Sequence, residues 1–114
     1  MNKIKDFFLN NSSVFIIDGG NGSELVNRGI KLEMPLWSCS AVINYPRLVE
    51  KVHIDYLNAG SCGIVANTFR TNPRTLDKVS LNFSSRELTN KAVNIALEAR
   101  DKINKGVYFL CDLN

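Results

Sequence analysis

Three short apolar runs, each ending at a polar residue, constrain the fold of this chain most. They cover residues 14–17, 64–66 and 107–110, and are followed by Asp18, Asn67 and Cys111. None of them alternates apolar with polar positions. A strand without alternation is buried on both faces, as in a parallel sheet covered by helices. The runs are therefore predicted to be three buried strands of one parallel sheet.

The stretches between these runs have the pattern of amphipathic helices. Pro46 suits a first helical position and Gly60 a left-handed stop, which predicts a helix over residues 46–59. Ser84 and Glu87 have capping-box spacing at the start of a second helix, over residues 84–104. Short helical turns are expected at 22–28 and 74–79. The two apolar stripes are Leu48, Val49, Val52, Tyr56 and Ala59, then Leu88, Ala92, Ile95, Ala96, Ala99 and Ile103.

The order strand, helix, strand, helix, strand predicts an α/β fold with a parallel sheet and right-handed crossovers. With 114 residues and no linker or internal repeat, the chain is expected to hold part of one domain. Its third predicted strand has no covering helix after it. We therefore expect residues 1–114 to be a partial domain, truncated after the third strand.

Charge and cysteine spacing argue against several functional classes. The 14 basic residues are scattered rather than clustered, so no nucleic-acid partner is expected. The three cysteines form no C-x-x-C pair, so neither a disulfide framework nor a local zinc site is predicted, and a reducing cytoplasm is the expected location. The apolar run near the N-terminus is too short to span a membrane.

Ligands of parallel α/β folds bind beyond the carboxyl ends of the strands. The first strand is followed by Asp18, Gly19 and Gly20, and the second by Asn67 and Thr68. A carboxylate can hold an ammonium group, and glycine amides can approach a carboxylate without a Cβ in the way. This pairing suits a ligand that carries both groups, and an amino acid is such a ligand.

Two other interpretations of the glycine turn remain at this point. A dinucleotide fingerprint from Gly20 would need glycine where the chain has Leu25, and no Gly-Lys-Ser/Thr triplet of a phosphate-binding loop follows. The carboxylate of Asp18 would also repel a pyrophosphate. The second interpretation is purely structural, with Asp18 capping the turn and the glycines bending it.

A longer series of motifs resembles the start of the homocysteine S-methyltransferase family. It runs through Asp18-Gly19-Gly20-x-Gly22-Ser23-Glu24-Leu25, Arg28-Gly29, Pro35-Leu36-Trp37-Ser38, Pro46-x-Leu48-Val49-x-x-Val52-His53-x-Asp55-Tyr56-Leu57-x-Ala59-Gly60 and Asn67-Thr68-Phe69. The match is specific over about residues 14–75. The resemblance implies the N-terminal part, the first three βα strands, of a (β/α)8 TIM-type barrel.

The activity implied by this resemblance is zinc-dependent methyl transfer to the thiol of homocysteine, giving methionine. The wider family uses S-methylmethionine, betaine and methylfolate-linked donors, and the tight match in the first third of the chain favours a sulfonium donor, S-methylmethionine or S-adenosylmethionine. Asp18 would hold the substrate ammonium, the Gly19 and Gly20 amides its carboxylate, and Asn67 and Thr68 would line the pocket. Zinc would deprotonate the thiol, which is only about 3% thiolate at pH 7 when free.

The family binds zinc through cysteines of later strands, including a Cys-Cys pair that this chain lacks. Cys39, Cys62 and Cys111 do not match those positions, so no metal ligand and no catalytic residue is assigned. Zinc is expected for the complete domain only. We expect the chain alone to be inactive and to bind neither zinc nor homocysteine tightly, unless a second chain completes the barrel. The alternative is a non-catalytic remnant that binds a partner chain or an amino-acid ligand through its open sheet.

Three further residues carry weaker expectations. His53 is the only histidine, but its place along the helix favours packing over catalysis. Asp55 lies two positions further on, so the two side chains do not face each other and form no dyad. Trp37 suits a pocket wall and simple packing equally well.

Overall fold

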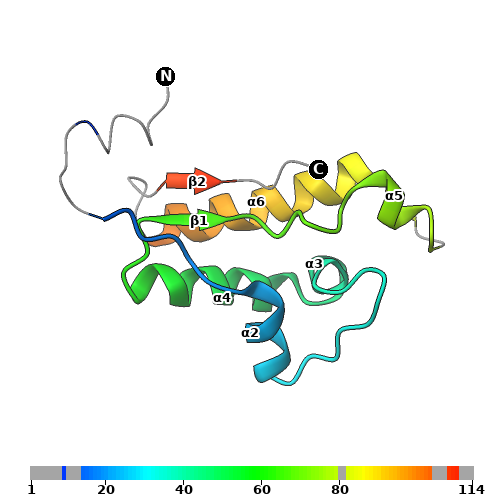
Figure 1. Ribbon diagram of the computed structural model, residues 1–114, viewed down its shortest axis with the longest axis horizontal. Coiled ribbons are helices and arrows are strands. Elements are labelled where there is room, and N and C mark those ends of the chain that lie inside the picture. The colour runs from blue at the N-terminus through cyan, green and yellow to red at the C-terminus, as the bar shows by residue number, and fades with distance from the viewer. Residues whose placement is uncertain (1–8, 10–13, 80–81, 104–107, 111–114) are drawn as a thin grey trace.

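The sheet is parallel, as predicted. The computed structural model describes residues 9, 14–79, 82–103 and 108–110. Strand β1 (Gly63–Val65) pairs with strand β2 (Tyr108–Leu110), with Ile64 opposite Phe109. On the other side of β1, Ile17 forms a parallel bridge with Gly63. The three apolar runs therefore lie side by side in the order 14–18, β1, β2 (Figure 1).

The prediction of a buried strand over residues 14–17 is wrong. Only Ile17 makes a bridge, and Val14, Ile16 and Ile17 are 78%, 54% and 50% exposed. These three side chains therefore remain largely in solvent, whereas Phe15 is half-buried. The third predicted strand is confirmed over residues 108–110, whereas Cys111 and Asp112 lie outside the described residues.

The helix predicted over residues 46–59 is α4 (Pro46–Asn58). Pro46 stands in its first turn, and Gly60 follows with φ +113°, the left-handed conformation expected of a stop. Val49 and Val52 are buried as predicted, but Ala59, the last member of the predicted stripe, is exposed. The pattern thus predicted Val49 and Val52 correctly but missed Glu50, His53 and Leu57, which are also buried.

The helix predicted after Ser84 is α6 (Ser85–Ile103). Ser84 Oγ accepts the Glu87 N–H at 3.1 Å, which is one half of the predicted capping box. The Glu87 carboxylate also accepts the Ser84 hydroxyl at 3.2 Å, a contact between side chains rather than the bond to the Ser84 backbone N–H that would complete the box. The stripe is buried apart from Ile103, which is 40% exposed; its buried members are Leu88, Ala92, Ile95, Ala96 and Ala99.

Three shorter helices complete the described chain. Helix α2 (Asn21–Asn27) and helix α5 (Pro73–Leu76) confirm the predicted turns, and the Asn72 side chain caps α5 by accepting the Thr75 N–H. Helix α3 (Cys39–Asn44) was not predicted. No helix in the described part of the chain has the length and apolar character needed to cross a bilayer.

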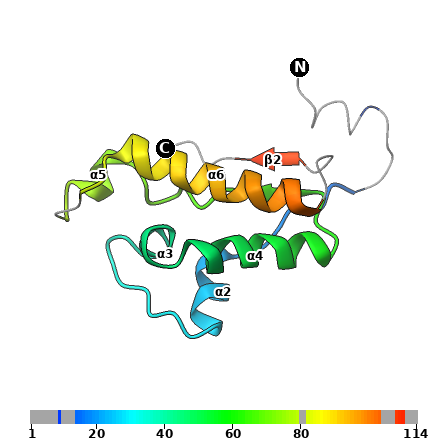
Figure 2. The same ribbon diagram turned by 180° about the vertical axis from the view of Figure 1, so that it is seen from behind.

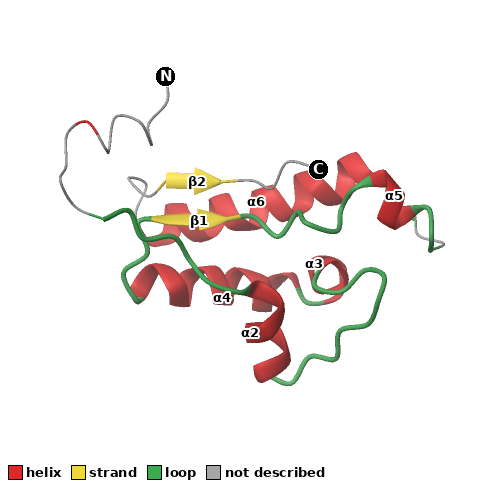
Figure 3. Ribbon diagram, in the orientation of Figure 1, coloured by secondary structure: helices red, strands yellow, loops and turns green. Residues whose placement is uncertain are grey.

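Helices α4 and α6 lie side by side and run back along the strands (Figures 1 and 2). Figure 3 shows the small yellow sheet against this much larger red helical layer. Strand β1 packs on both helices. Its contact is an apolar cluster of Leu57, Ile64, Ala66 and Ala96.

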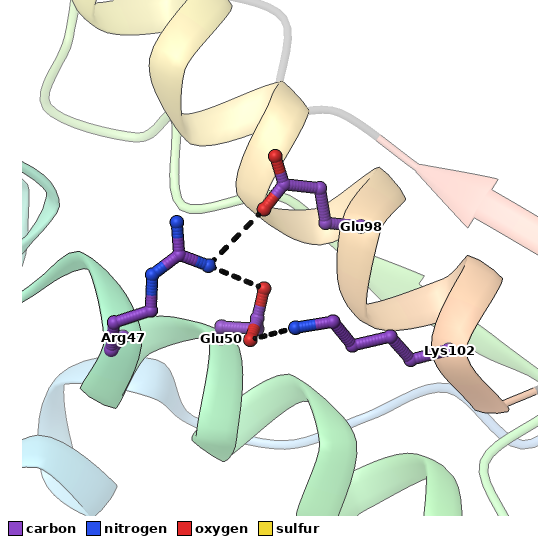
Figure 4. Close-up of polar contacts among 4 residues, drawn as sticks. All are labelled: Arg47, Glu50, Glu98 and Lys102. Atoms are coloured by element: carbon purple, nitrogen blue, oxygen red, sulfur yellow. Dashed lines mark hydrogen bonds and ion pairs between the residues drawn. The ribbon is translucent and has the colours of Figure 1, made fainter.

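A charged cluster also joins the two long helices (Figure 4). The carboxylate of Glu50 on α4 is only 7% exposed, and it accepts from Lys102 of α6 at 2.7 Å and from Arg47 at 3.0 Å. Arg47 reaches across to Glu98 of α6 at 3.3 Å. The hydrogen bond from Lys102 is the main reason why the pKa of Glu50 lies below its usual range. Because both cations are largely exposed, solvent screens much of the attraction.

His53 occupies a packing position, as predicted. It follows Glu50 by one turn of α4 and is fully buried. Neither ring nitrogen has a hydrogen-bond partner among the described residues. Burial lowers the pKa of His53 to about 4, so the imidazole is neutral at pH 7.

Candidate functional site

Asp18 is fixed by β1 through both its backbone and its side chain. Its N–H donates to the Gly63 carbonyl oxygen at 3.1 Å, and both carboxylate oxygens lie 3.3 Å from the Val65 N–H. The chain then turns away from the sheet through Gly19 and Gly20 into α2 (Figure 1). The carboxylate therefore sits at the carboxyl end of the bridge between segment 14–18 and β1.

A cavity of about 330 Å³ opens beside this carboxylate. This volume is at the lower end of the range for small-ligand sites. It brings together three of the predicted site residues, Asp18, Gly19 and Asn67. Its other lining residues are Ile17, Asn21, Gly22, Ser38, Val65, Ala66 and Phe69.

The two remaining predicted residues are neighbours of the cavity rather than part of its wall. Gly20 is the N-cap of α2, with an ordinary φ of −61°. Thr68 is 1% exposed, and its carbonyl oxygen accepts the Thr71 hydroxyl at 3.0 Å. Contact of either residue with a ligand stays a prediction.

Asn67 is held by Ser38, a partner that the sequence pattern did not predict. Ser38 Oγ donates to Asn67 Oδ1 at 2.8 Å, and Asn67 Nδ2 donates to the Ser38 carbonyl oxygen at 2.9 Å. Both residues are buried. The Asn67 carboxamide is thus fixed in orientation where it meets the cavity.

The turn at Gly19 and Gly20 contacts the side chain of Tyr56 on α4. The Tyr56 hydroxyl donates to the Gly20 carbonyl oxygen at 3.0 Å. A Cβ at Gly19 would lie 2.8 Å from that hydroxyl oxygen and 3.1 Å from the ring, so position 19 requires glycine for packing. A Cβ at Gly20 would meet only the Ser23 hydroxyl, which can rotate away. The helical pattern predicted Tyr56 only as an apolar position and did not indicate this polar role.

Trp37 packs on the first turn of α2. A Cβ at Gly22 would lie 2.5 Å from the indole Nε1, so the ring occupies the space that a side chain would fill. Trp37 does not line the cavity, and of the two roles left open by the sequence, packing is the one observed. Its φ of +48° is strained for a residue with a Cβ.

The described residues do not fit a metal centre. They contain no group of three His, Cys, Asp or Glu side chains that could hold a metal ion. Burial raises the pKa of the Cys39 thiol to about 11, which disfavours the thiolate that a metal would bind. Asp55 pairs with Arg28 at 2.8 Å and Lys51 at 2.9 Å rather than with His53, so the expected absence of a dyad holds.

Comparison with known proteins gives one consistent family. A family model described as homocysteine S-methyltransferase matches residues 15–112. Homocysteine S-methyltransferase 3 of Zea mays is 39% identical over 93 residues, which are 79% of this chain and 27% of that protein. Selenocysteine methyltransferase of Astragalus bisulcatus is 35% identical over 101 residues, which are 86% of this chain and 29% of that protein.

The same family is found among solved structures. The crystal structure of the homocysteine methyltransferase of Escherichia coli, in its metallated form, superposes with a TM-score of 0.81 at 26% sequence identity. The match covers 96% of this chain and 39% of that one. This chain therefore spans well under half the length of the relatives that it matches.

Proposed function

The chain belongs to the homocysteine S-methyltransferase family, and we propose that it forms the amino-acid end of a homocysteine-binding site. The observation that carries this proposal is the meeting of Asp18, Gly19 and Asn67 on one cavity. An anion, a close backbone approach and a fixed carboxamide are the groups that an amino-acid ligand needs. The relatives are named for homocysteine and selenocysteine, both of which carry an ammonium and a carboxylate.

In this proposal Asp18 binds the substrate ammonium. A carboxylate has about four acceptor positions, so it can accept the Val65 N–H and an ammonium at the same time. The amides of the Gly19–Gly20 turn receive the substrate carboxylate, and Asn67 and Thr68 hold the far side of the site. Because β1 fixes Asp18 before any ligand arrives, little reorganisation is needed on binding.

The reaction of the complete domain would transfer a methyl group from a sulfonium donor, S-methylmethionine or S-adenosylmethionine, to the homocysteine sulfur. The thiol loses its proton, the new S–CH3 bond gives methionine, and the donor leaves as a neutral thioether. Residues of this chain would bind and orient the amino-acid end, which holds the sulfur in position for in-line attack.

We propose that the remainder of the domain completes a (β/α)8 barrel and supplies its zinc. The parallel order of the three segments and the superposition on the Escherichia coli enzyme support the barrel. The metallated form of that enzyme supports a metal. Zinc would lower the pKa of the substrate thiol. Since the described residues do not fit a zinc site, its ligands would come from another part of the domain.

The proposal is tested by titrating homocysteine into the ¹⁵N-labelled chain at millimolar ligand concentration. Binding should move the amide resonances of residues 18–22 and 65–68 and leave those of α6 in place. S-methylcysteine is the matched control, because it has the same ammonium and carboxylate as homocysteine. It differs in having one methylene fewer before the sulfur and a thioether in place of the thiol. Shifts spread evenly over the chain, or none in residues 18–22, would refute the site.

Exposed apolar side chains favour a second candidate, a non-catalytic chain that docks on a partner through the open side of its sheet. Val14 and Ile16 are more than half exposed beside β1. Substituting both with Thr separates the two candidates. A docking role predicts that the double variant loses its association with itself or with a partner, measured by analytical ultracentrifugation. The chemical-shift changes caused by homocysteine, measured by the same titration, should stay unchanged.

A further inference from the structure

Two buried polar residues on the cavity wall hold each other in a fixed arrangement. Ser38 is 7% exposed and Asn67 is 4% exposed, and both line the cavity. Ser38 Oγ donates to Asn67 Oδ1 at 2.8 Å, and Asn67 Nδ2 donates to the Ser38 carbonyl oxygen at 2.9 Å. The pair therefore brings two polar side chains, each more than nine-tenths buried, to the same cavity.

The Ser38 hydroxyl does not perform the usual task of a serine at its position. Ser38 is the N-cap of α3, where a serine hydroxyl commonly accepts an N–H of the first helical turn. It makes no such bond here, and its proton goes to Asn67, 29 residues further along the chain. The hydroxyl thus fixes the carboxamide of Asn67 rather than the start of the helix.

The two bonds allow the carboxamide only one orientation. A backbone carbonyl can only accept, so the Asn67 atom beside the Ser38 carbonyl oxygen is the nitrogen, and the Ser38 hydroxyl donates to the oxygen. A carboxamide nitrogen carries two N–H groups. No further hydrogen bond of the Asn67 side chain occurs among the described residues, so its second N–H is left for a ligand.

We propose that Ser38 is a positioning residue that keeps this second N–H of Asn67 turned toward the cavity, where it donates to the carboxylate of the bound amino acid. The inference rests on the proposed function for the identity of the ligand. A carboxylate has two oxygens, so one can accept from Asn67 while the other accepts from the amides of the Gly19–Gly20 turn. A ligand without a carboxylate would leave the buried N–H unpaired, and the site therefore selects against it.

The first test uses the wild-type 114-residue chain. The two Nδ2 protons of Asn67 give separate NMR signals, which their different distances from the Asn67 β-protons distinguish. Millimolar homocysteine should move the free proton and leave the proton on the Ser38 carbonyl in place. The control ligand is 3-aminopropanethiol, which is homocysteine without its carboxylate, and it should move neither. Equal movement of both protons by homocysteine, or equal effects of the two ligands, would overturn the proposal.

The second test is a double-mutant cycle of Ser38→Ala and Asn67→Ala, with homocysteine affinity as the readout and urea unfolding as the measure of the folded fraction. Ser38→Ala should weaken binding roughly two- to tenfold, the effect of one neutral hydrogen bond. Ser38→Thr keeps the hydroxyl and should bind more tightly than Ser38→Ala. In the Asn67→Ala protein, adding Ser38→Ala should cause no further loss, because Ser38 acts through Asn67.

Ser61→Ala is the control for these variants and should bind as the wild type does. Its hydroxyl is half-buried and makes no hydrogen bond among the described residues. Additive losses in the double variant would overturn the proposal. A loss in Ser38→Ala that unfolding fully accounts for would overturn it too, because Ser38 would then be structural only.

Failure of the proposed function has a different signature from failure of this inference. If homocysteine moves no amide of residues 18–22 or 65–68, the ligand is wrong and both fail. If those amides move while the free Asn67 proton stays in place, homocysteine binds and only the role of Ser38 and Asn67 is overturned.

Discussion

Ser38 and Asn67 hold each other through two hydrogen bonds, of 2.8 and 2.9 Å, although 29 residues separate them in the chain. One bond runs from the Ser38 hydroxyl to the Asn67 carboxamide oxygen and the other from the carboxamide nitrogen to the Ser38 backbone. This pair ties the loop before α3 to the end of β1, on the wall of the candidate site.

Ser38→Ala should therefore destabilise the chain by about 1–3 kcal/mol, because it leaves a buried carboxamide oxygen without its donor. Urea unfolding measures the loss. Ser61→Ala removes a half-buried hydroxyl that makes no hydrogen bond among the described residues, and is the control. Equal effects of the two substitutions would show that the pair contributes no net stability.

Gly19 and Gly20 should respond differently to alanine. Gly19→Ala places a Cβ 2.8 Å from the Tyr56 hydroxyl and should cost about 1–3 kcal/mol, as overpacking does. Gly20→Ala meets only the Ser23 hydroxyl, so stability should stay within about 0.5 kcal/mol. Its homocysteine affinity should nevertheless fall if the Gly20 amide binds the ligand carboxylate as proposed, although Gly20 does not line the cavity itself.

Unfolding and titration of both glycine variants separate these effects. If Gly20→Ala lost stability and kept its affinity, the glycine would serve turn geometry alone. Gly20→Ala is also made together with Ser23→Ala, which removes the hydroxyl that the new Cβ would meet. The double variant should still bind homocysteine more weakly than the wild type.

Stability should depend on pH through His53. Its folded pKa of about 4 lies below the ordinary 6.5, so the unfolded chain binds more protons between these values. The unfolding free energy should therefore fall as the pH drops from about 6.5 toward 4, by about 1.2 kcal/mol between pH 7 and 5.5.

His53→Leu provides the control for this pH dependence, because the chain has no other histidine. Leucine fills the buried site without an unpaired nitrogen, so stability at pH 7 should change little or rise. Urea unfolding at pH 7 and 5.5 should show the loss in the wild type and not in the variant. A loss of the same size in both would assign it to other groups.

The long helices could be predicted because their signals are local. Pro46, Gly60 and the Ser84 cap act within one or two turns, and the 3.6-residue spacing of Val49 and Val52 identifies a buried face. The parallel direction of the three segments could also be predicted, since strands joined by helices pair in parallel.

The errors arose where distant contacts decide the structure. The run 14–17 looks buried by composition, but burial depends on what covers the sheet, and Val14, Ile16 and Ile17 remain largely in solvent. Helix α3 is six residues long and has no side-chain cap, so it left no pattern to find.

The candidate site could be predicted only in part, for the same reason. Asp18 and Asn67 were found because they follow strands. Ser38 and Tyr56, which fix the site, make their contacts across 29 and 36 residues. No spacing along the chain indicates such pairs. The polar role of Tyr56 was further hidden by its membership of an apolar stripe.

The affinity of Asp18→Asn for homocysteine tests the central claim most directly. Asparagine keeps an acceptor for the Val65 N–H and removes only the charge that would bind the ammonium. A charge-assisted hydrogen bond is worth about 1.5–3 kcal/mol, so binding should weaken roughly ten- to a hundredfold in a titration followed by NMR. Asp77→Asn, at an exposed position after α5, should bind as the wild type does. Equal affinity of all three proteins would contradict the assignment and leave Asp18 as a structural cap of β1.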